Sequence, residues 1–189
     1  MVKERFSDAG VNFVIQAEQK GTGHAVMMTE KNLKGQDGDV LVLCGDCPLI
    51  TPKTIMALYS EHRDSGSEAT VLSAELEDPS GYGRIVRRED GSVDAIVEQK
   101  DAGSDILAIK EVNSGIYIFK NKSLFDALGR IGSDNSQNEY YLTDTVSIIR
   151  KNGGRVAALR VIDPSEIMGV NNIEQLEGLE AIINNKKIL

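Results

Sequence analysis

The chain lacks any apolar run close to the roughly 20 residues that a membrane-spanning helix needs. Its first residues also lack the apolar centre of a signal peptide. Positive charge is scarce, because 21 Lys and Arg residues face 29 Asp and Glu residues and leave a formal net charge of −8. Nucleic acid backbones are held by clustered cations, so this balance argues against a nucleic acid partner. These absences predict a cytoplasmic protein that contacts neither membranes nor nucleic acids.

Cysteine is nearly absent as well, and the two that exist, Cys44 and Cys47, form a single C-x-x-C. A structural zinc site needs four ligands, and there is no second cysteine pair to supply them. A redox dithiol usually opens a helix after a strand, and a helix is expected soon after Pro48, so a redox role stays open. In a reducing cytoplasm, ordinary free thiols are the simpler interpretation.

The composition, with 41% hydrophobic and 26% charged residues over 189 positions, is typical of one globular domain. Strand-like and helix-like segments alternate along it, which predicts an α/β sheet. The apolar run Asp39–Cys44 predicts a strand buried on both faces of a parallel sheet. Asp90-Gly91 between two short strands predicts a hairpin. Strands are expected at 11–15, 69–76, 84–88, 93–98, 112–119 and 155–162. Helices are expected at 51–62, in a segment that Ser123 caps, at 143–151 and at 171–189. Thr51 should cap the first helix with Pro52 as its first residue, and Glu174 is placed for a capping box in the last.

The segment Gln16–Ala25 combines two glycines around Thr22 with the start of a helix. Glycines there let the backbone approach a ligand at a helix N-terminus. Gln16 and Gln19 carry the paired donors and acceptors that can recognise a base edge. A strand-to-helix turn with solvated amides explains the same pattern, so both interpretations stay open. His24 by itself is more simply a residue at a helix start.

Four further places carry polar groups that suit a site. Asp46 follows a central strand, where open α/β sheets bind ligands, and a carboxylate there suits Mg²⁺, although it can equally cap or turn the chain. The loop Gly81–Gly83 either contacts a flat or bulky group or is a plain turn. Glu98 and Asn113 can hold sugar hydroxyls or be satisfied polar groups at a sheet edge. Asn171 also suits a helix N-cap.

Taken in order, these segments resemble one family. The segments are Q-A-E-Q-K-G-T-G-H-A (16–25), G-D-C-P-L (45–49), D-P-S-G-Y-G-R-I (78–85), I-V-E-Q-K-D-A (96–102), E-V-N-S-G-I (111–116), E-Y-Y-L-T-D (139–144) and G-V-N-N (169–172). They are similar to the uridyltransferase domain of bacterial bifunctional N-acetylglucosamine-1-phosphate uridyltransferase/glucosamine-1-phosphate acetyltransferases. The resemblance runs from about Val11 to the final helix. It implies a Rossmann-like nucleotidyltransferase sheet with an antiparallel hairpin insertion.

The resemblance also implies an activity and the residues that serve it. The family transfers uridylyl from UTP to N-acetylglucosamine 1-phosphate, which yields UDP-N-acetylglucosamine and pyrophosphate for cell-wall precursor synthesis. The phosphate nucleophile is already an anion, so no catalytic residue beyond the metal site is expected. The implied uridine and UTP contacts are Gln16, Gln19, Gly21, Thr22, Cys44, Gly45 and Asp46, the implied sugar contacts are Gly83, Glu98, Asn113, Tyr141, Thr143 and Asn171, and the implied Mg²⁺ ligands are Asp46 and Asn171.

Two departures from the family pattern matter. The 189 residues contain no loop of the type L-A-A-G-x-G-T-R-M with its following Lys, so the first strand and the main phosphate cradle are missing. They also contain no acetyltransferase β-helix, through which the full-length family protein forms a trimer, and 171–189 would start the connecting helix. We therefore expect residues 1–189 to be one N-terminally truncated domain with impaired transfer. A nucleotidyltransferase for another sugar 1-phosphate, or a non-catalytic sugar-nucleotide-binding remnant, are the alternatives.

Overall fold

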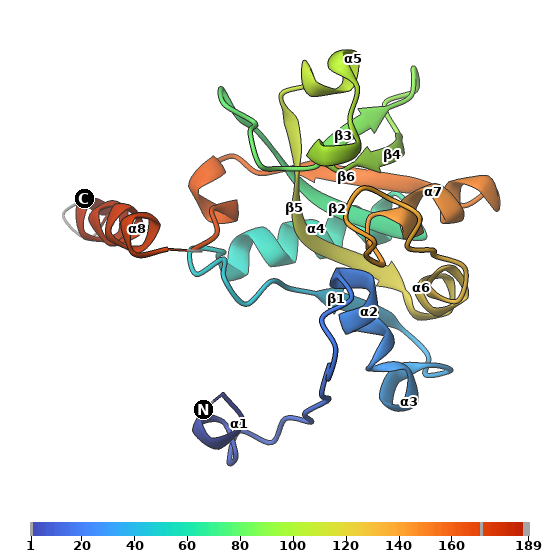
Figure 1. Cartoon of the computed structure of the whole chain (residues 1–189), viewed down its shortest axis with the longest axis horizontal. Coiled ribbons are helices and arrows are strands. Elements are labelled where there is room, and N and C mark those ends of the chain that lie inside the picture. Colours follow the sequence, from blue (N-terminus) through green and yellow to red (C-terminus); the bar gives the residue numbers. More distant parts are fainter. Residues whose placement is uncertain (1, 171, 187–189) are drawn as a thin grey trace.

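The computed structural model describes residues 2–170 and 172–186. Its strands are β1 (Asp39–Val42), β2 (Ala69–Glu75), β3 (Arg84–Arg87), β4 (Val93–Val97), β5 (Glu111–Lys120) and β6 (Val156–Arg160). They form one open six-stranded sheet in the order β4-β3-β5-β2-β6, and β1 also pairs with β5 (Figure 1). The fold is mixed α/β with a Rossmann-like sheet, as the sequence predicts.

Helices connect these strands and cover the sheet. They are α1 (Val2–Arg5), α2 (Thr22–Met27), α3 (Glu30–Leu33), α4 (Pro52–Asp64), α5 (Ser104–Leu107), α6 (Asn121–Leu128), α7 (Asp144–Lys151) and α8 (Ile173–Lys186), with 3-10 turns at Gln99–Asp101 and Pro164–Ile167. Within the described residues, no helix has both the length and the apolar content to cross a membrane.

Two local predictions are confirmed by the hydrogen bonds and backbone angles of the structure. The Thr51 hydroxyl accepts the backbone N–H of Thr54 at 3.2 Å, and Pro52 follows as the first residue of α4. This satisfies one of the N–H groups that a helix start leaves unpaired. β3 and β4 pair antiparallel, and Gly91 turns the chain between them with a φ of +79°. The predicted hairpin insertion is therefore present.

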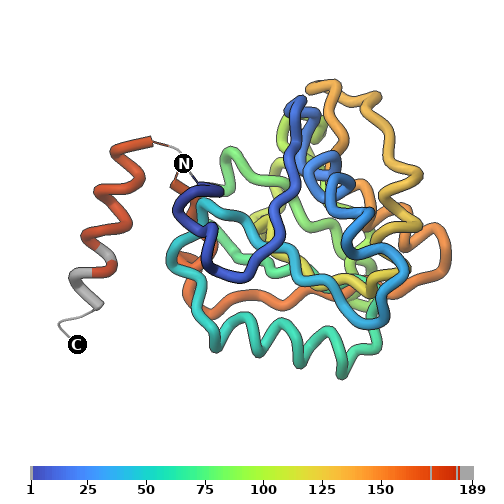
Figure 2. Tube along the Cα trace, turned by 90° about the horizontal axis from the view of Figure 1, so that it is seen from below, coloured from blue at the N-terminus to red at the C-terminus, as the bar shows by residue number. Residues whose placement is uncertain are grey.

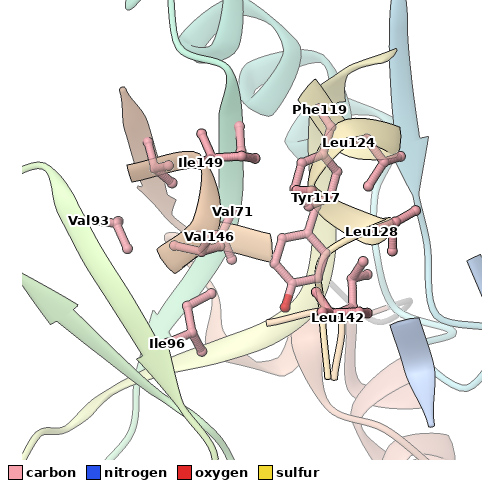
Figure 3. Packing of buried hydrophobic residues seen from close by; sticks show 14 of the residues in the cluster. Val71, Val93, Ile96, Tyr117, Phe119, Leu124, Leu128, Leu142, Val146 and Ile149 are labelled. Carbon is pink, nitrogen blue, oxygen red and sulfur yellow. The ribbon is translucent and has the colours of Figure 1, made fainter. Parts of the chain in front are cut away.

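Each face of the sheet has its own hydrophobic cluster. On one face, α6 and α7 pack on β2, β4 and β5 through residues such as Leu124, Val146 and Tyr117 (Figure 3). On the other face, α4 packs through Leu58 against Leu72 and its neighbours, and Figure 2 shows α4 running along that side. The sheet therefore lies between two helical layers that cover its faces. The ends of its strands remain open for a site.

The structure corrects the prediction for the first strand. β1 spans Asp39–Val42, pairs antiparallel with β5, and alternates exposed and half-buried residues. It is therefore neither parallel nor buried on both faces. Among the described residues no strand pairs with the outer edge of β1, so one row of its backbone groups has no strand partner. The Leu41 side chain is also 40% exposed.

Three other predictions are wrong in detail. Residues 11–15 form no strand, because no strand within the described residues pairs with them and their apolar side chains are exposed. Ser123 does not cap α6, which begins two residues earlier, and its hydroxyl donates to Glu68 instead. The described cap of α8 is Asn172, whose side-chain oxygen accepts the N–H of Gln175 at 2.8 Å, so Glu174 is one residue too early for a capping box.

Candidate functional site

The start of α2 is held against a segment more than 110 residues later in the chain. The Tyr140 N–H donates to the Lys20 carbonyl at 2.8 Å, and the Gly23 N–H donates to the Tyr140 carbonyl at 2.8 Å. The Thr22 hydroxyl accepts the Leu142 N–H at 3.1 Å. Three hydrogen bonds therefore join the segment 20–23 to the segment 140–142. This contact is called the joint below.

Close approach explains both glycines of the first motif. Gly21 has a φ of +101°, and a Cβ there would lie 2.7 Å from the Tyr140 carbonyl oxygen. A Cβ on Gly23 would lie 2.6 Å from the Ile131 side chain and 2.9 Å from the same carbonyl. Larger residues would push the two segments apart. Gly21 and Thr22, expected to bind the uridine end, thus have a structural role in the fold.

A cavity of about 320 Å³ opens beside this joint. It brings together α2, the end of β1, β5 and the segment before α7. Its walls are mainly apolar, and among the described residues no Lys or Arg lines it. Five residues that the family resemblance assigns to the site line this one cavity, although they are spread over 122 positions of the sequence. The lining residues are Thr22, Ala25, Val26, Thr29, Val42, Leu43, Cys44, Glu98, Asn113, Gly115, Tyr117, Leu142 and Thr143.

Glu98 is the only carboxylate that the described part of the chain contributes to this lining. The Thr143 hydroxyl donates to its Oε1 at 3.1 Å, which orients the carboxylate. Gly83 lies beside this carboxylate, since a Cβ on Gly83 would be 3.4 Å from Oε2. Burial raises the pKa of Glu98, the Thr143 hydrogen bond opposes this, and the negative charges of Asp144 and Asp101 add to the increase. An oriented carboxylate in an apolar cavity is suited to accept hydrogen bonds from hydroxyl groups of a ligand.

Asn113 lies at an irregularity of β5. Its Oδ1 accepts the N–H of Gly115 at 3.2 Å, and its own N–H donates to the Gly83 carbonyl at 2.9 Å. Gly115 has a φ of +79°, and a Cβ there would lie 2.7 Å from the Cys44 sulfur. The strand therefore places a carboxamide, a glycine and a thiol at one wall of the cavity.

The other predicted residues that the structure describes are not part of this lining. The Gln16 amide nitrogen donates to the Gly21 carbonyl and contacts His24 Nδ1, both at 3.0 Å, while Gln19 is exposed. Tyr141 lines a neighbouring cavity of about 300 Å³ that shares Glu98 and Thr143, and its hydroxyl accepts from Gln137 at 2.8 Å. Gly45 is exposed beyond the end of β1.

Asp46 is the described half of the predicted metal pair, because Asn171 lies outside the described residues. The Asp46 side chain is exposed, and its backbone carbonyl accepts the Val170 N–H at 2.9 Å. The chain thus brings Asp46 beside the segment that leads to Asn171. The described residues contain no group of three or more His, Cys, Asp or Glu that could hold a metal. A site here would therefore be an open one, in which a single carboxylate offers oxygen to a hard cation and the ligand supplies other oxygens.

Comparison with known proteins decides the family. A family model described as nucleotidyl transferase matches residues 1–162. The chain belongs to the nucleotidyl transferase family. Bifunctional protein GlmU of Bacillus cereus (strain G9842), of Bacillus thuringiensis (strain Al Hakam) and of Bacillus anthracis (strain CDC 684 / NRRL 3495) are each 46% identical to it over 186 residues. These matches cover 98% of the chain and 40% of each relative, so the chain spans about two fifths of their length.

Of the two cysteines, Cys44 lines the 320 Å³ cavity and Cys47 does not. Both thiols are free in the structure. The Cys44 sulfur donates to the Gly115 carbonyl at 3.3 Å, and Cys47 is buried beside the Ile167 carbonyl. Contact with Cys44 raises the pKa of Cys47, and burial raises it further, while the same contact lowers the pKa of Cys44. That zinc does not bind here stays a prediction.

Sequence reasoning missed part of the cavity of this nucleotidyl transferase. Ala25 and Val26 on α2 look like ordinary helix residues, Thr29 lies in the turn after α2, and Tyr117 looks like one of several core residues in β5. Only Gly115, out of place inside an apolar strand, signals that β5 is irregular there.

Proposed function

We propose that this domain transfers uridylyl from UTP to N-acetylglucosamine 1-phosphate. The observation that carries the proposal is the convergence of Thr22, Cys44, Glu98, Asn113 and Thr143 on one cavity. These residues match nucleotide-facing and sugar-facing positions of the family, and the reaction needs the two ligands side by side. The identity to proteins named Bifunctional protein GlmU supports the same substrates.

In the proposed reaction an oxygen of the sugar phosphate attacks the α-phosphorus of UTP in line. A bond forms between them, the bond from the α-phosphorus to the bridging oxygen breaks, and pyrophosphate leaves with that oxygen. The nucleophile is already an anion, so none of the chain's groups has to remove a proton. Glu98 and Asn113 would hold the sugar, and Thr143 would keep Glu98 oriented. The protein's main contribution is thus positioning.

The charge balance of the site supports a cation requirement. No Lys or Arg of the described residues lines the cavity, yet the substrates carry several negative charges. Nucleotidyl transferases generally use divalent metal ions, and we propose Mg²⁺ with Asp46 and Asn171 as its protein ligands. When bound, such an ion offsets charge on the reacting phosphates. The trimer expected for full-length relatives also remains a prediction.

The test measures Mg²⁺-dependent pyrophosphate release from UTP and N-acetylglucosamine 1-phosphate. We expect the 189-residue chain to be inactive or severely impaired, because removing even one preorganised charge-stabilising donor typically costs about 10²–10³ in rate. Adding an upstream segment with the glycine-rich loop should restore turnover. In that extended protein Asp46→Ala should abolish turnover, while Asp37→Ala, an exposed carboxylate before β1, should leave it unchanged.

Each alternative has its own outcome in this experiment. Faster turnover with a different sugar 1-phosphate would replace the proposed substrate. Binding of UDP-N-acetylglucosamine without turnover in the extended protein would favour a non-catalytic binding role. Robust release by the 189-residue chain alone would show that the glycine-rich loop is dispensable.

A further inference from the structure

The two cysteines flank one tight turn. Gly45 and Asp46 form a turn between the end of β1 and the start of α4, with Cys44 before it and Cys47 after it. The Cα atoms at the two ends of a four-residue turn lie within about 7 Å of each other. Disulfides join residues whose Cα atoms are about 4.4–6.8 Å apart. The fold therefore holds the two cysteines within the reach of a disulfide.

The turn also has room to adjust. Gly45 and Asp46 are both exposed, and a Cβ on Gly45 would meet no atom within 4 Å. Helix α4 begins only at Pro52, so the pair does not lie at a helix start as it does in a typical redox dithiol. Its proximity comes from the turn alone. Small rotations of this turn can bring the two sulfurs together without moving β1 or α4.

Each sulfur has only weak partners that hold it in the reduced position. The Cys44 thiol donates to the Gly115 carbonyl at 3.3 Å. The Cys47 thiol lies 3.7 Å from the Ile167 carbonyl oxygen and 3.8 Å from Asp46 Oδ1. Thiols are weak hydrogen-bond donors, so breaking these contacts costs little free energy. A covalent bond between the sulfurs can therefore replace them.

The two thiols differ in access. Cys44 is half-buried and lines the 320 Å³ cavity, so a small molecule in the cavity meets its sulfur. Cys47 is only 7% exposed and is not part of that lining. An oxidant that enters the cavity therefore reaches Cys44 first, with Cys47 placed behind it as the second thiol. A reactive thiol beside a second cysteine is the usual arrangement of a reversible oxidation site.

We infer that Cys44 and Cys47 form a site of reversible oxidation in the wall of the cavity, where a peroxide converts their two thiols into one disulfide. The Cys44 sulfur attacks one peroxide oxygen, the O–O bond breaks, and water leaves with the thiol proton, which gives a sulfenic acid. The Cys47 sulfur then attacks the Cys44 sulfur, the S–S bond forms, the S–O bond breaks, and a second water leaves. Hydrogen peroxide gains two electrons and each sulfur loses one. A dithiol reductant reverses the change by thiol–disulfide exchange.

Oxidation changes the cavity itself. To bond Cys47, the Cys44 sulfur must leave the Gly115 carbonyl, which belongs to another residue of the cavity lining. The Cys47 sulfur must likewise leave the Ile167 carbonyl. The disulfide therefore alters the wall that the nucleotide is proposed to contact.

The experiment treats the reduced chain with hydrogen peroxide, blocks the remaining thiols with iodoacetamide, and maps tryptic peptides by mass. Both cysteines lie in the single tryptic peptide 35–53. After peroxide this peptide should be two hydrogen atoms lighter and carry no label. Reduction with dithiothreitol before blocking should restore two labelled thiols. Met56, which is 61% exposed and lies outside this peptide, reports the peroxide dose through its sulfoxide.

Two variants test the order of events. In Cys47→Ser a sulfenic acid should accumulate on Cys44 and be trapped by dimedone. In Cys44→Ser the buried Cys47 should remain a free thiol at the same dose. Two labelled thiols in wild type whose Met56 is already oxidised, or disulfides only between chains, would overturn the inference. The wild-type map decides this even if a variant fails to fold.

A ligand tests the route through the cavity, and this arm rests on the proposed function. Saturating UDP-N-acetylglucosamine should slow disulfide formation in a chain that binds it by calorimetry, because the ligand covers Cys44. An unchanged rate in such a chain would contradict access through the cavity. Absence of binding would instead count against the proposed function, and the peptide map would still decide whether the disulfide forms.

Discussion

Glu98 combines two properties that oppose each other. It is a carboxylate oriented by the hydroxyl of Thr143, which suits a ligand with hydroxyl groups. Its charge is also partly removed from water and lies near other acids, including Asp144 and Asp101, which raises its pKa. Keeping it ionised in the folded chain therefore reduces stability. Such a conflict between binding and stability is common at functional sites.

This conflict predicts the behaviour of Glu98→Gln. The pKa of Glu98 is higher in the folded than in the unfolded chain, so its stabilising contribution is present below the usual glutamate range and is lost as the pH rises through the raised pKa. Thermal unfolding should show the variant more stable than wild type near pH 7, with the difference gone near about pH 4. Glu89→Gln, in the exposed hairpin turn, should show no such pattern. A stability gain that is independent of pH would contradict the explanation.

At the scale of elements, the position of α2 depends on its joint with the segment 139–142. Helix α2 is six residues long, too short to be stable alone, and supplies Thr22 and two further residues of the cavity wall. The backbone bonds of Lys20 and Gly23 with Tyr140 hold it in place. The shape of the cavity is therefore set by a contact between distant segments.

Replacing Gly23 by Ala tests this joint. The new Cβ would lie 2.6 Å from the Ile131 side chain and 2.9 Å from the Tyr140 carbonyl, so the segments must separate. We expect a loss of about 1–3 kcal/mol in the free energy of unfolding, measured by urea denaturation, and weaker binding of UDP-N-acetylglucosamine. Gly132→Ala, where the nearest atom would be 4.0 Å away, should change neither quantity. Wild-type stability in Gly23→Ala would mean that the joint yields freely.

At the scale of the whole molecule, one side of the sheet is open. The outer edge of β1 has no strand partner among the described residues, and Leu41 and Leu43 are 40% and 49% exposed. The apolar stretch 11–15 is also exposed and extended, on an arm that reaches away from the body (Figure 1). An unpaired edge beside apolar surface is a template for pairing with another chain.

We therefore expect the 189-residue chain to self-associate as its concentration rises, which light scattering after size exclusion measures. Leu41→Lys should shift this association to higher concentrations, because a charge on an edge strand opposes pairing. Ile162→Lys, at an apolar side chain that is 96% exposed but distant from β1 in the sheet order, should have little effect. A chain that stays monomeric at every concentration would contradict this expectation.

The sequence by itself determined the features that depend on neighbours along the chain. The Thr51 cap, the hairpin turn at Gly91, and the helix and strand periods were all predictable, because each depends on residues only a few positions apart. The order of motifs was equally sufficient to identify the family, which the nucleotidyl transferase match over residues 1–162 confirms. For the site, the motifs marked Glu98, Asn113 and Thr143, and these do line one cavity.

Only the tertiary structure decided what depends on residues far apart. The exposure of β1 and the lack of a strand at 11–15 follow from which partners lie beside them, and no local pattern contains that information. The role of Thr22 as an acceptor for Leu142 arises from a contact across 120 residues, and the irregularity of β5 around Gly115 arises from the register of β5 on β2. Propensity acts within a few residues, whereas strand pairing and packing decide which side chains meet.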